Sequence, residues 1–157
     1  MQLEVRAAAG YRPADKEEVL LAAARYAVMD VPRQSASSPS KAVEALRQHL
    51  GHLDREVFGA VWLDARHWIL DFDVISVGTV DSAVVPVREV ARKAIERNAA
   101  ACLLAHNHPS GQVEPSTADE IITQRIKDAL SLFDIRVIDH VVLGRESSYS
   151  FAQHGLI

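Results

Sequence analysis

The hydrophobic period changes several times along this chain, and the order of these changes constrains the fold more than any other feature. Apolar residues first follow a strand-like pattern over residues 56–64 and 67–78, with a turn at Asp64, Ala65 and Arg66. Two such neighbouring runs predict a pair of antiparallel strands. Helical and strand-like patterns then alternate, with a helix from Pro86 to Asn98, a strand over 99–105, a helix over 116–133 and strands over 135–144 and 148–152. This order predicts an α/β fold in which a mixed β-sheet is flanked by helices.

The first 50 residues are predicted to contain two helices joined by a linker. Residues 14–29 place acidic side chains early and have an alanine-rich body, which favours a helix. Residues 31–40 are rich in serine and proline and indicate a linker, from whose end Ser38 caps a short helix that begins at Pro39. We therefore divide the chain into an N-terminal helix with a Ser/Pro linker, residues 1–37, and a domain over residues 38–157.

Length and composition exclude several classes of protein. The 157 residues, 48% of them apolar, suffice for one hydrophobic core. The single cysteine, Cys102, rules out an internal disulfide and a zinc site built from cysteines, and it fits a reducing cytoplasm. No apolar run approaches the roughly 20 residues of a membrane span, and the N-terminus lacks a signal-peptide pattern. The net charge of −4 weighs against a nucleic-acid binder that ignores sequence. We therefore expect a cytoplasmic protein without a membrane segment.

Metal-capable side chains concentrate in one place, the run LLAHNHPSGQVEPSTAD. His106 and His108 lie two residues apart at the end of a predicted strand, so their side chains point to the same side. Ser116 and Asp119 lie three residues apart across the first turn of the next helix, which places Asp119 opposite the histidines. Two imidazoles and one carboxylate leave one position of a tetrahedral Zn²⁺ open for water, as in catalytic zinc sites. The sequence therefore predicts one Zn²⁺ per chain, although the same ligand set does not exclude iron, cobalt or nickel.

Part of this pattern has a second interpretation. Ser116 followed by Asp119 is also typical of a helix N-cap with an acid in the first turn. Capping alone leaves the adjacent pair His106 and His108 unexplained, so the metal site is the better interpretation of the whole run.

Four further residues are weighed against their ordinary structural roles. His140, in the predicted strand IRVIDHVVLG, could orient a metal ligand, but a lone strand histidine is more often a hydrogen-bonded core residue, and we favour that interpretation. Cys102 is expected to be an inert buried thiol. Trp62 and Trp68 are expected to pack in the core as strand residues.

The spacing His-x-His, seven residues, Ser, two residues, Asp is the metal-binding signature of the JAMM (MPN) metalloprotease fold. The surrounding sequence resembles the bacterial RadC family, in the short form found without a helix-hairpin-helix domain. The resemblance runs from about Ser38 to Ile157 and is carried by the segments EVFGAVWLDARHWIL, SVGTVDSAVVPVREVARKAIERNAAACLLAHNHPSGQVEPSTAD and IRVIDHVVLG.

The resemblance implies a JAMM/MPN sheet fold related to that of the cytidine deaminases, with His106, His108 and Asp119 as zinc ligands. It also implies two roles that the spacing does not assign. Glu56 corresponds to the glutamate that acts as general acid and base, and Ser116 to the serine that stabilises the oxyanion. From the residues alone, Glu56 is one acidic residue at the start of a strand, where a solvated edge charge is the ordinary interpretation.

One departure from the signature concerns the substrate. Most JAMM peptidases carry Ser or Thr between the two histidines, whereas this chain has Asn107, as RadC-like sequences do. The resemblance alone therefore does not imply that this chain shares the isopeptide substrate of the JAMM peptidases.

The leading function is a zinc-dependent metallohydrolase that cleaves an amide or isopeptide bond of a peptide or protein substrate. The runner-up is a DNA-repair-associated accessory protein without peptidase activity, as the RadC label suggests. Net charge disfavours nucleic acid, and acidic neighbours dilute the basic face of the helix after Pro86, which carries Arg88, Arg92, Lys93 and Arg97. An interaction module with a dead site would generally lack the ligands, and a zinc deaminase needs cysteines that this chain does not have.

Overall fold

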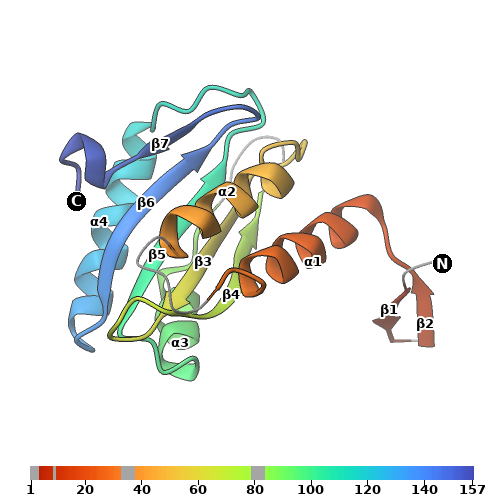
Figure 1. Cartoon of the computed structure of the whole chain (residues 1–157), viewed down its shortest axis with the longest axis horizontal. Coiled ribbons are helices and arrows are strands. Elements are labelled where there is room, and N and C mark those ends of the chain that lie inside the picture. The colour runs from red at the N-terminus through yellow and green to blue at the C-terminus, as the bar shows by residue number, and fades with distance from the viewer. Residues whose placement is uncertain (1–3, 9, 33–37, 79–83) are drawn as a thin grey trace.

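The computed structural model describes residues 4–8, 10–32, 38–78 and 84–157. Its central element is a five-stranded sheet in the order β4-β3-β5-β6-β7 (Figure 1). Strands β5 and β6 are parallel and the other neighbours are antiparallel, so the sheet is mixed and the predicted α/β fold is confirmed. The strands are β3 (Val57–Leu63), β4 (Ile69–Val77), β5 (Ala101–Asn107), β6 (Arg136–Leu143) and β7 (Ser148–Ser150). The short helix η1 (Ala152–His154) follows β7.

Helices cover both faces of this sheet. One face packs against α1 (Lys16–Met29) and α2 (Ser38–Leu50), and the other against α3 (Val87–Glu96) and α4 (Thr117–Ser131). The alternation of side chains along β3 divides its residues between the two cores, with Val57 and Val61 on the first face and Phe58 and Trp62 on the second. Strand β5 lies at the centre of the sheet and all of its residues are buried. In the described part of the chain, no helix is both long enough and apolar enough to cross a membrane.

The N-terminal part differs from the expectation in two respects. A hairpin of β1 (Glu4–Ala7) and β2 (Gly10–Pro13), which was not predicted, lies away from the sheet (Figure 1). Its residues are almost all exposed, and each strand has only four residues, which is too short for a hydrophobic pattern to predict a strand. The second helix begins at Ser38, one residue before its predicted start at Pro39, so residues 38–40 of the Ser/Pro stretch belong to α2. Residues 33–37 of the predicted linker lie outside the described residues. Helix α1 begins within two residues of its predicted start.

Three apolar residues that were expected to be buried are not. Ile95 is 52% exposed, because the apolar stripe of α3 is wider than the surface that covers it. Phe133 is 50% exposed and lies beyond α4, which ends at Ser131 rather than at the predicted residue 133. Trp68 lies before β4 in the turn rather than on a strand, and the guanidinium of Arg66 lies 5.2 Å from its ring centroid. This turn is held by the Asp64 carboxylate, which accepts hydrogen bonds from the backbone N–H groups of Arg66 and Trp68.

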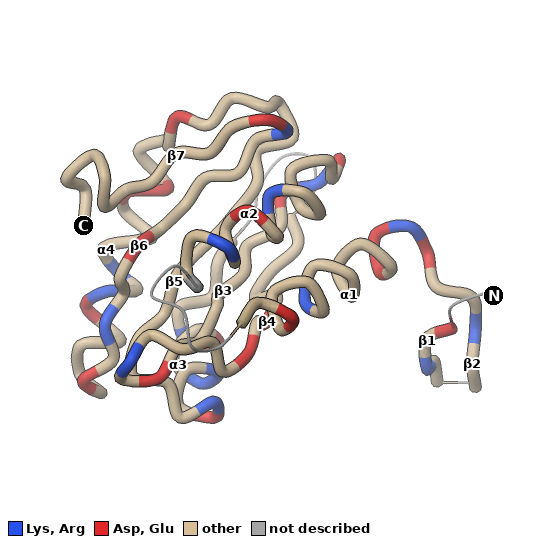
Figure 2. The backbone as a smooth tube through the Cα atoms, viewed as in Figure 1, with Lys and Arg blue, Asp and Glu red and all other residues tan. Residues whose placement is uncertain are grey.

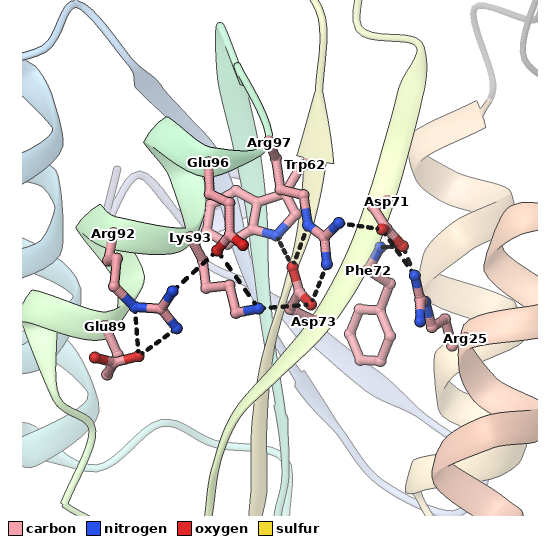
Figure 3. A network of polar contacts seen from close by, with 10 residues as sticks. All are labelled: Arg25, Trp62, Asp71, Phe72, Asp73, Glu89, Arg92, Lys93, Glu96 and Arg97. Carbon is pink, nitrogen blue, oxygen red and sulfur yellow. Dashed lines mark hydrogen bonds and ion pairs between the residues drawn. The ribbon is translucent and has the colours of Figure 1, made fainter.

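A charged network covers the edge strand β4 and ties helices from both faces to it (Figure 3). The Arg25 guanidinium of α1 donates two hydrogen bonds to Asp71, at 3.0 and 2.9 Å. Arg97, at the end of α3, forms an ion pair with Asp71 at 2.9 Å and donates two hydrogen bonds of 2.8 Å to Asp73. The indole N–H of Trp62 also donates to Asp73. Such charges protect an edge strand from pairing with other chains.

We expect the stability of the protein to depend on this network in a pH-dependent way. Burial alone would raise the pKa of Asp73, but hydrogen bonds from Arg97 and Trp62 lower it to about 2 from its ordinary value of 3.8. Because the folded pKa is the lower one, the stabilisation is complete above the ordinary value and is lost as the pH falls toward 2. Asp73→Asn should lower the free energy of unfolding at neutral pH by about 1–3 kcal/mol.

Urea unfolding at pH 7 and at pH values between 4 and 2 checks this expectation. The difference between wild type and Asp73→Asn should shrink as the pH falls. Asp128→Asn is the matched control, because the exposed Asp128 carboxylate accepts from the Gln124 amide rather than from a cation. Equal midpoints for the two variants at neutral pH would refute a stabilising role for the Asp73 carboxylate.

Candidate metal centre

Strand β5 delivers both histidines of the sequence signature to one spot. The strand was predicted to end at Ala105, but it continues to Asn107 because β3 pairs with it as far as His106 and β6 as far as Asn107. His106 is therefore a strand residue, and it is fully buried. His108 follows directly after the strand, and its side chain lies on the same side as His106, as the spacing predicted.

Asp119 approaches the histidines from the first turn of α4. Ser116 is the N-cap of this helix, and its Oγ accepts a hydrogen bond of 3.2 Å from the backbone N–H of Asp119. The Asp119 carboxylate in turn accepts from the backbone N–H of Ser116, at 2.7 Å, and from its hydroxyl, at 2.8 Å. The capping interpretation is thus correct, and it is compatible with a metal site because the capping box fixes the orientation of the carboxylate.

The three side chains converge at distances that suit a metal ion. The Nε2 atoms of His106 and His108 are 2.9 Å apart, and each lies 3.3 Å from an oxygen of Asp119. A tetrahedral ion with ligands at 2.0–2.1 Å places neighbouring ligand atoms roughly 3.3 Å apart. All three ligand atoms lie within 4.8 Å of one another. This group can hold a metal ion.

Electrostatics favour the ionised carboxylate that a metal ligand needs. Burial alone would raise the pKa of Asp119, but hydrogen bonds with His106 and His108 and the charge of His106 hold it well below its ordinary value. The hydrogen bond with Asp119 raises the pKa of His108, so a metal ion competes with a proton for this imidazole. Burial is the main cause that lowers the pKa of His140 well below its ordinary value, so this imidazole is neutral. The carboxylate is therefore ionised at neutral pH and ready to balance a bound cation.

His140 contacts one of the candidate ligands. It is fully buried and hydrogen-bonded, as the favoured interpretation of a core histidine requires. Its partner, however, is His106, whose Nδ1 lies 2.8 Å from His140 Nε2. The interpretation that we weighed less, a histidine that orients a ligand, therefore describes this position better.

Thr123 is a residue of the site that sequence analysis missed. It is 2% exposed, and its Oγ1 lies 2.6 Å from His140 Nδ1 and 2.5 Å from the backbone oxygen of Asp119. The available signal was a polar residue four positions after Asp119, on the helix face that also carries the apolar residues Ile126 and Leu130.

Asn107, between the two histidines, has a structural role. Its side chain points to the opposite face from theirs and is fully buried. Its Oδ1 accepts from the backbone N–H of Val57 at 2.7 Å, and its Nδ2 donates to the backbone oxygen of Arg55 at 2.9 Å. These two backbone groups flank Glu56. An amide can satisfy an N–H and a C=O together, so Asn107 fixes the backbone that carries Glu56.

Glu56 reaches the same groove as the metal-capable group. A groove of about 570 Å³ is lined by Glu56, His108, Ser116 and Asp119. Its remaining walls are largely apolar and come from Phe58, Val84, Val85, Ala118, Ile121 and Ile122, with Arg125 one turn further along α4. The structure thus brings together all five residues that the sequence singled out, since His106 lies directly behind His108.

The other candidate residues have structural roles. Cys102 is buried as expected, and burial raises the pKa of its thiol to about 12, which disfavours the reactive thiolate. Trp62 is fully buried in the core, as expected. Gly111 has φ of +80° in the turn after His108, a conformation in which glycine carries no steric cost.

Comparison with known proteins agrees with this geometry. The family described as "RadC-like JAB domain" matches residues 36–156. Relatives called "UPF0758 protein" occur in Leptothrix cholodnii, 46% identical over 94% of this chain and 68% of the relative, and in Chromohalobacter salexigens, 51% identical over 76% of this chain and 53% of the relative. A relative of the same description from Vibrio cholerae is 54% identical over 71% of this chain and 70% of its own length. The match thus spans from about half to about two-thirds of the length of these relatives.

Proposed function

The chain belongs to the family of RadC-like JAB domains, and from this membership and its donor set we propose that it is a zinc-dependent hydrolase of the metallopeptidase type. The convergence of two imidazole Nε2 atoms and one carboxylate at a groove carries the proposal. Two histidines and one acid are a ligand set of catalytic zinc sites, which keep one position for water. A single buried cysteine suits a reducing compartment, so we place this activity in the cytoplasm.

A bound Zn²⁺ would polarise a substrate carbonyl and bring the pKa of water toward neutrality. The protein's own residues then have separate tasks. Glu56, in the wall of the groove, accepts the proton of the attacking water and delivers it to the leaving nitrogen. Asn107 supports this task because it holds the backbone on either side of Glu56.

Ser116 is the residue that we assign to the oxyanion. Its hydroxyl lines the groove and donates to Asp119 when no substrate is bound. When Asp119 serves as a ligand, the hydroxyl hydrogen can turn toward the developing negative charge while the backbone N–H of Ser116 keeps its bond to Asp119. Such a donor stabilises the transition state more than the substrate.

The walls of the groove favour a particular substrate. Val84 and Ile121 are exposed, at 80% and 57%, and form an apolar surface beside the metal-capable group. We propose that an aliphatic side chain next to the scissile amide packs here, with Arg125 available to an acidic group further along the substrate. This chemistry does not require the ubiquitin-linked substrates that deubiquitinating JAMM enzymes cleave.

Nucleic acid binding has less support. Figure 2 shows Lys and Arg next to Asp and Glu along α2 and α3. Of the basic residues of α3, Arg92 pairs with Glu89 and Glu96, and Arg97 with the β4 carboxylates. Cations that are already paired within the protein neutralise few phosphates.

The test begins with protein purified without a metal-affinity step. Elemental analysis should find about one zinc per chain, and the zinc-loaded protein should cleave members of a peptide and isopeptide library, with aliphatic residues beside the cut. Full zinc occupancy with no cleavage across the library would overturn the peptidase assignment. Tight binding to duplex DNA that weakens steeply with salt would favour the accessory role instead.

A further inference from the structure

We propose that Thr123 and His140 are positioning residues that set the tautomer of His106, so that its Nε2 presents a lone pair to the metal ion. This inference rests on the proposed metal site but concerns residues outside the signature. It follows from counting hydrogens along one buried chain of contacts that runs from the α4 backbone through β6 to β5.

The chain of contacts begins at an atom that can only accept. The backbone oxygen of Asp119 lies 2.5 Å from Thr123 Oγ1, and a hydroxyl has a single hydrogen to donate. When Thr123 donates to that oxygen, it can only accept from His140 at its second contact of 2.6 Å. His140 Nδ1 then carries the hydrogen.

The positions of the other hydrogens along the chain of contacts follow from this one. A neutral imidazole has one N–H, so His140 Nε2 is an acceptor. It lies 2.8 Å from His106 Nδ1, which must donate, and His106 Nε2 is left with a free lone pair. From the Asp119 backbone oxygen to His106 Nδ1, each contact in this order joins one donor to one acceptor, and the Nε2 lone pair of His106 faces His108 and Asp119.

The second histidine reaches the same state by a separate contact. His108 Nδ1 lies 2.8 Å from the backbone oxygen of Gln112, which can only accept, so in the neutral imidazole Nδ1 donates and Nε2 is free. In this order two Nε2 lone pairs 2.9 Å apart and an ionised carboxylate converge without a hydrogen between them. A cation satisfies such a cluster of acceptors.

The reverse order of hydrogens along this chain of contacts excludes His106 as a metal ligand. If Thr123 donates to His140, every hydrogen along the chain shifts, and His106 carries its hydrogen on Nε2, where it points at His108. A protonated nitrogen cannot ligate a metal ion. Metal binding therefore requires the first order, whose far end is the Thr123 hydroxyl.

The matched variants are Thr123→Val, which keeps the shape but removes the hydroxyl, and Thr123→Ser, which keeps the hydroxyl. In Thr123→Val the ligating order leaves a buried N–H of His140 without an acceptor, so zinc binding has to overcome that cost. We expect zinc affinity, from chelator competition at one neutral pH, to fall roughly 10- to 100-fold in Thr123→Val and to stay near wild type in Thr123→Ser.

A direct reading of the tautomers accompanies the affinities. Nitrogen-15 NMR of the zinc-loaded wild type should show His106 and His140 each protonated on Nδ1, and urea unfolding of the metal-free variants identifies any loss of fold. A hydrogen on His140 Nε2 in the zinc-loaded wild type, or equal zinc affinity in folded Thr123→Val, would overturn the relay. A wild-type protein that binds no zinc would instead overturn the proposed function.

Discussion

Replacing Asp119 with asparagine is expected to abolish tight zinc binding and, with it, hydrolysis. The substitution keeps an oxygen that can accept the hydrogen bonds of Ser116, so the start of α4 should stay intact. It removes the negative charge that lies 3.3 Å from the Nε2 atoms of both His106 and His108. The loss of affinity should therefore exceed the roughly 10- to 100-fold that is typical of losing a group that only supports a ligand.

Glu120→Gln is the matched control for this prediction. Glu120 is the next residue of the same helix turn, it is exposed, and it carries the same charge near the helix N-terminus. Zinc competition, the shift of Tm on adding zinc, and turnover of a cleaved peptide should all remain near wild type in this control. An Asp119→Asn protein that binds zinc as tightly as Glu120→Gln would show that the carboxylate is not a ligand.

Glu56→Gln is expected to separate catalysis from metal binding. The amide has nearly the same shape as the carboxylate but cannot accept a proton, so turnover should fall by roughly 10²- to 10⁴-fold. Zinc affinity should be unchanged, because the metal-capable group consists of His106, His108 and Asp119. The decrease should appear mainly in kcat, since Glu56 lies in the groove wall and acts on the proton rather than on substrate affinity.

Asp54→Asn serves as the control for Glu56→Gln. Asp54 is exposed, lies two residues earlier in the same loop and is not part of the groove wall. Its removal lowers the local negative charge by the same amount, so any effect of charge alone appears in both variants. If Glu56→Gln retains wild-type kcat, another group moves the proton and the assignment of Glu56 is wrong.

Spacing was enough to predict the core of the site. Two histidines separated by one residue share a face wherever a strand ends, and Ser116 with Asp119 marks the first turn of a helix whatever surrounds it. Both patterns are local, so the sequence contains them fully. Glu56 is different, because it comes to the groove through the pairing of β3 with β5, and only the family resemblance singled it out.

The contacts around His140 could not be predicted in this way. His106 and His140 are 34 residues apart, and they meet because β5 and β6 run parallel with Leu104 opposite His140, after a shift of register between Cys102 and Leu103. A shift of that register by one residue would turn His140 to the other face of the sheet. The exposure of Ile95 has a similar cause, because a helical pattern shows which residues share a stripe but not how much of the stripe is covered. The same pattern assigned Phe133 to a helix that in fact ends at Ser131.

The donors of the metal-capable group are held by the protein itself. His106 is fixed through His140, His108 through the Gln112 carbonyl, and Asp119 through the Ser116 capping box. Zinc fingers, by contrast, fold only around their ion. The scaffold should therefore survive chelation and accept cobalt(II) in place of zinc. A visible absorption spectrum of the cobalt form would then report on coordination number during turnover, in a protein that has no colour of its own.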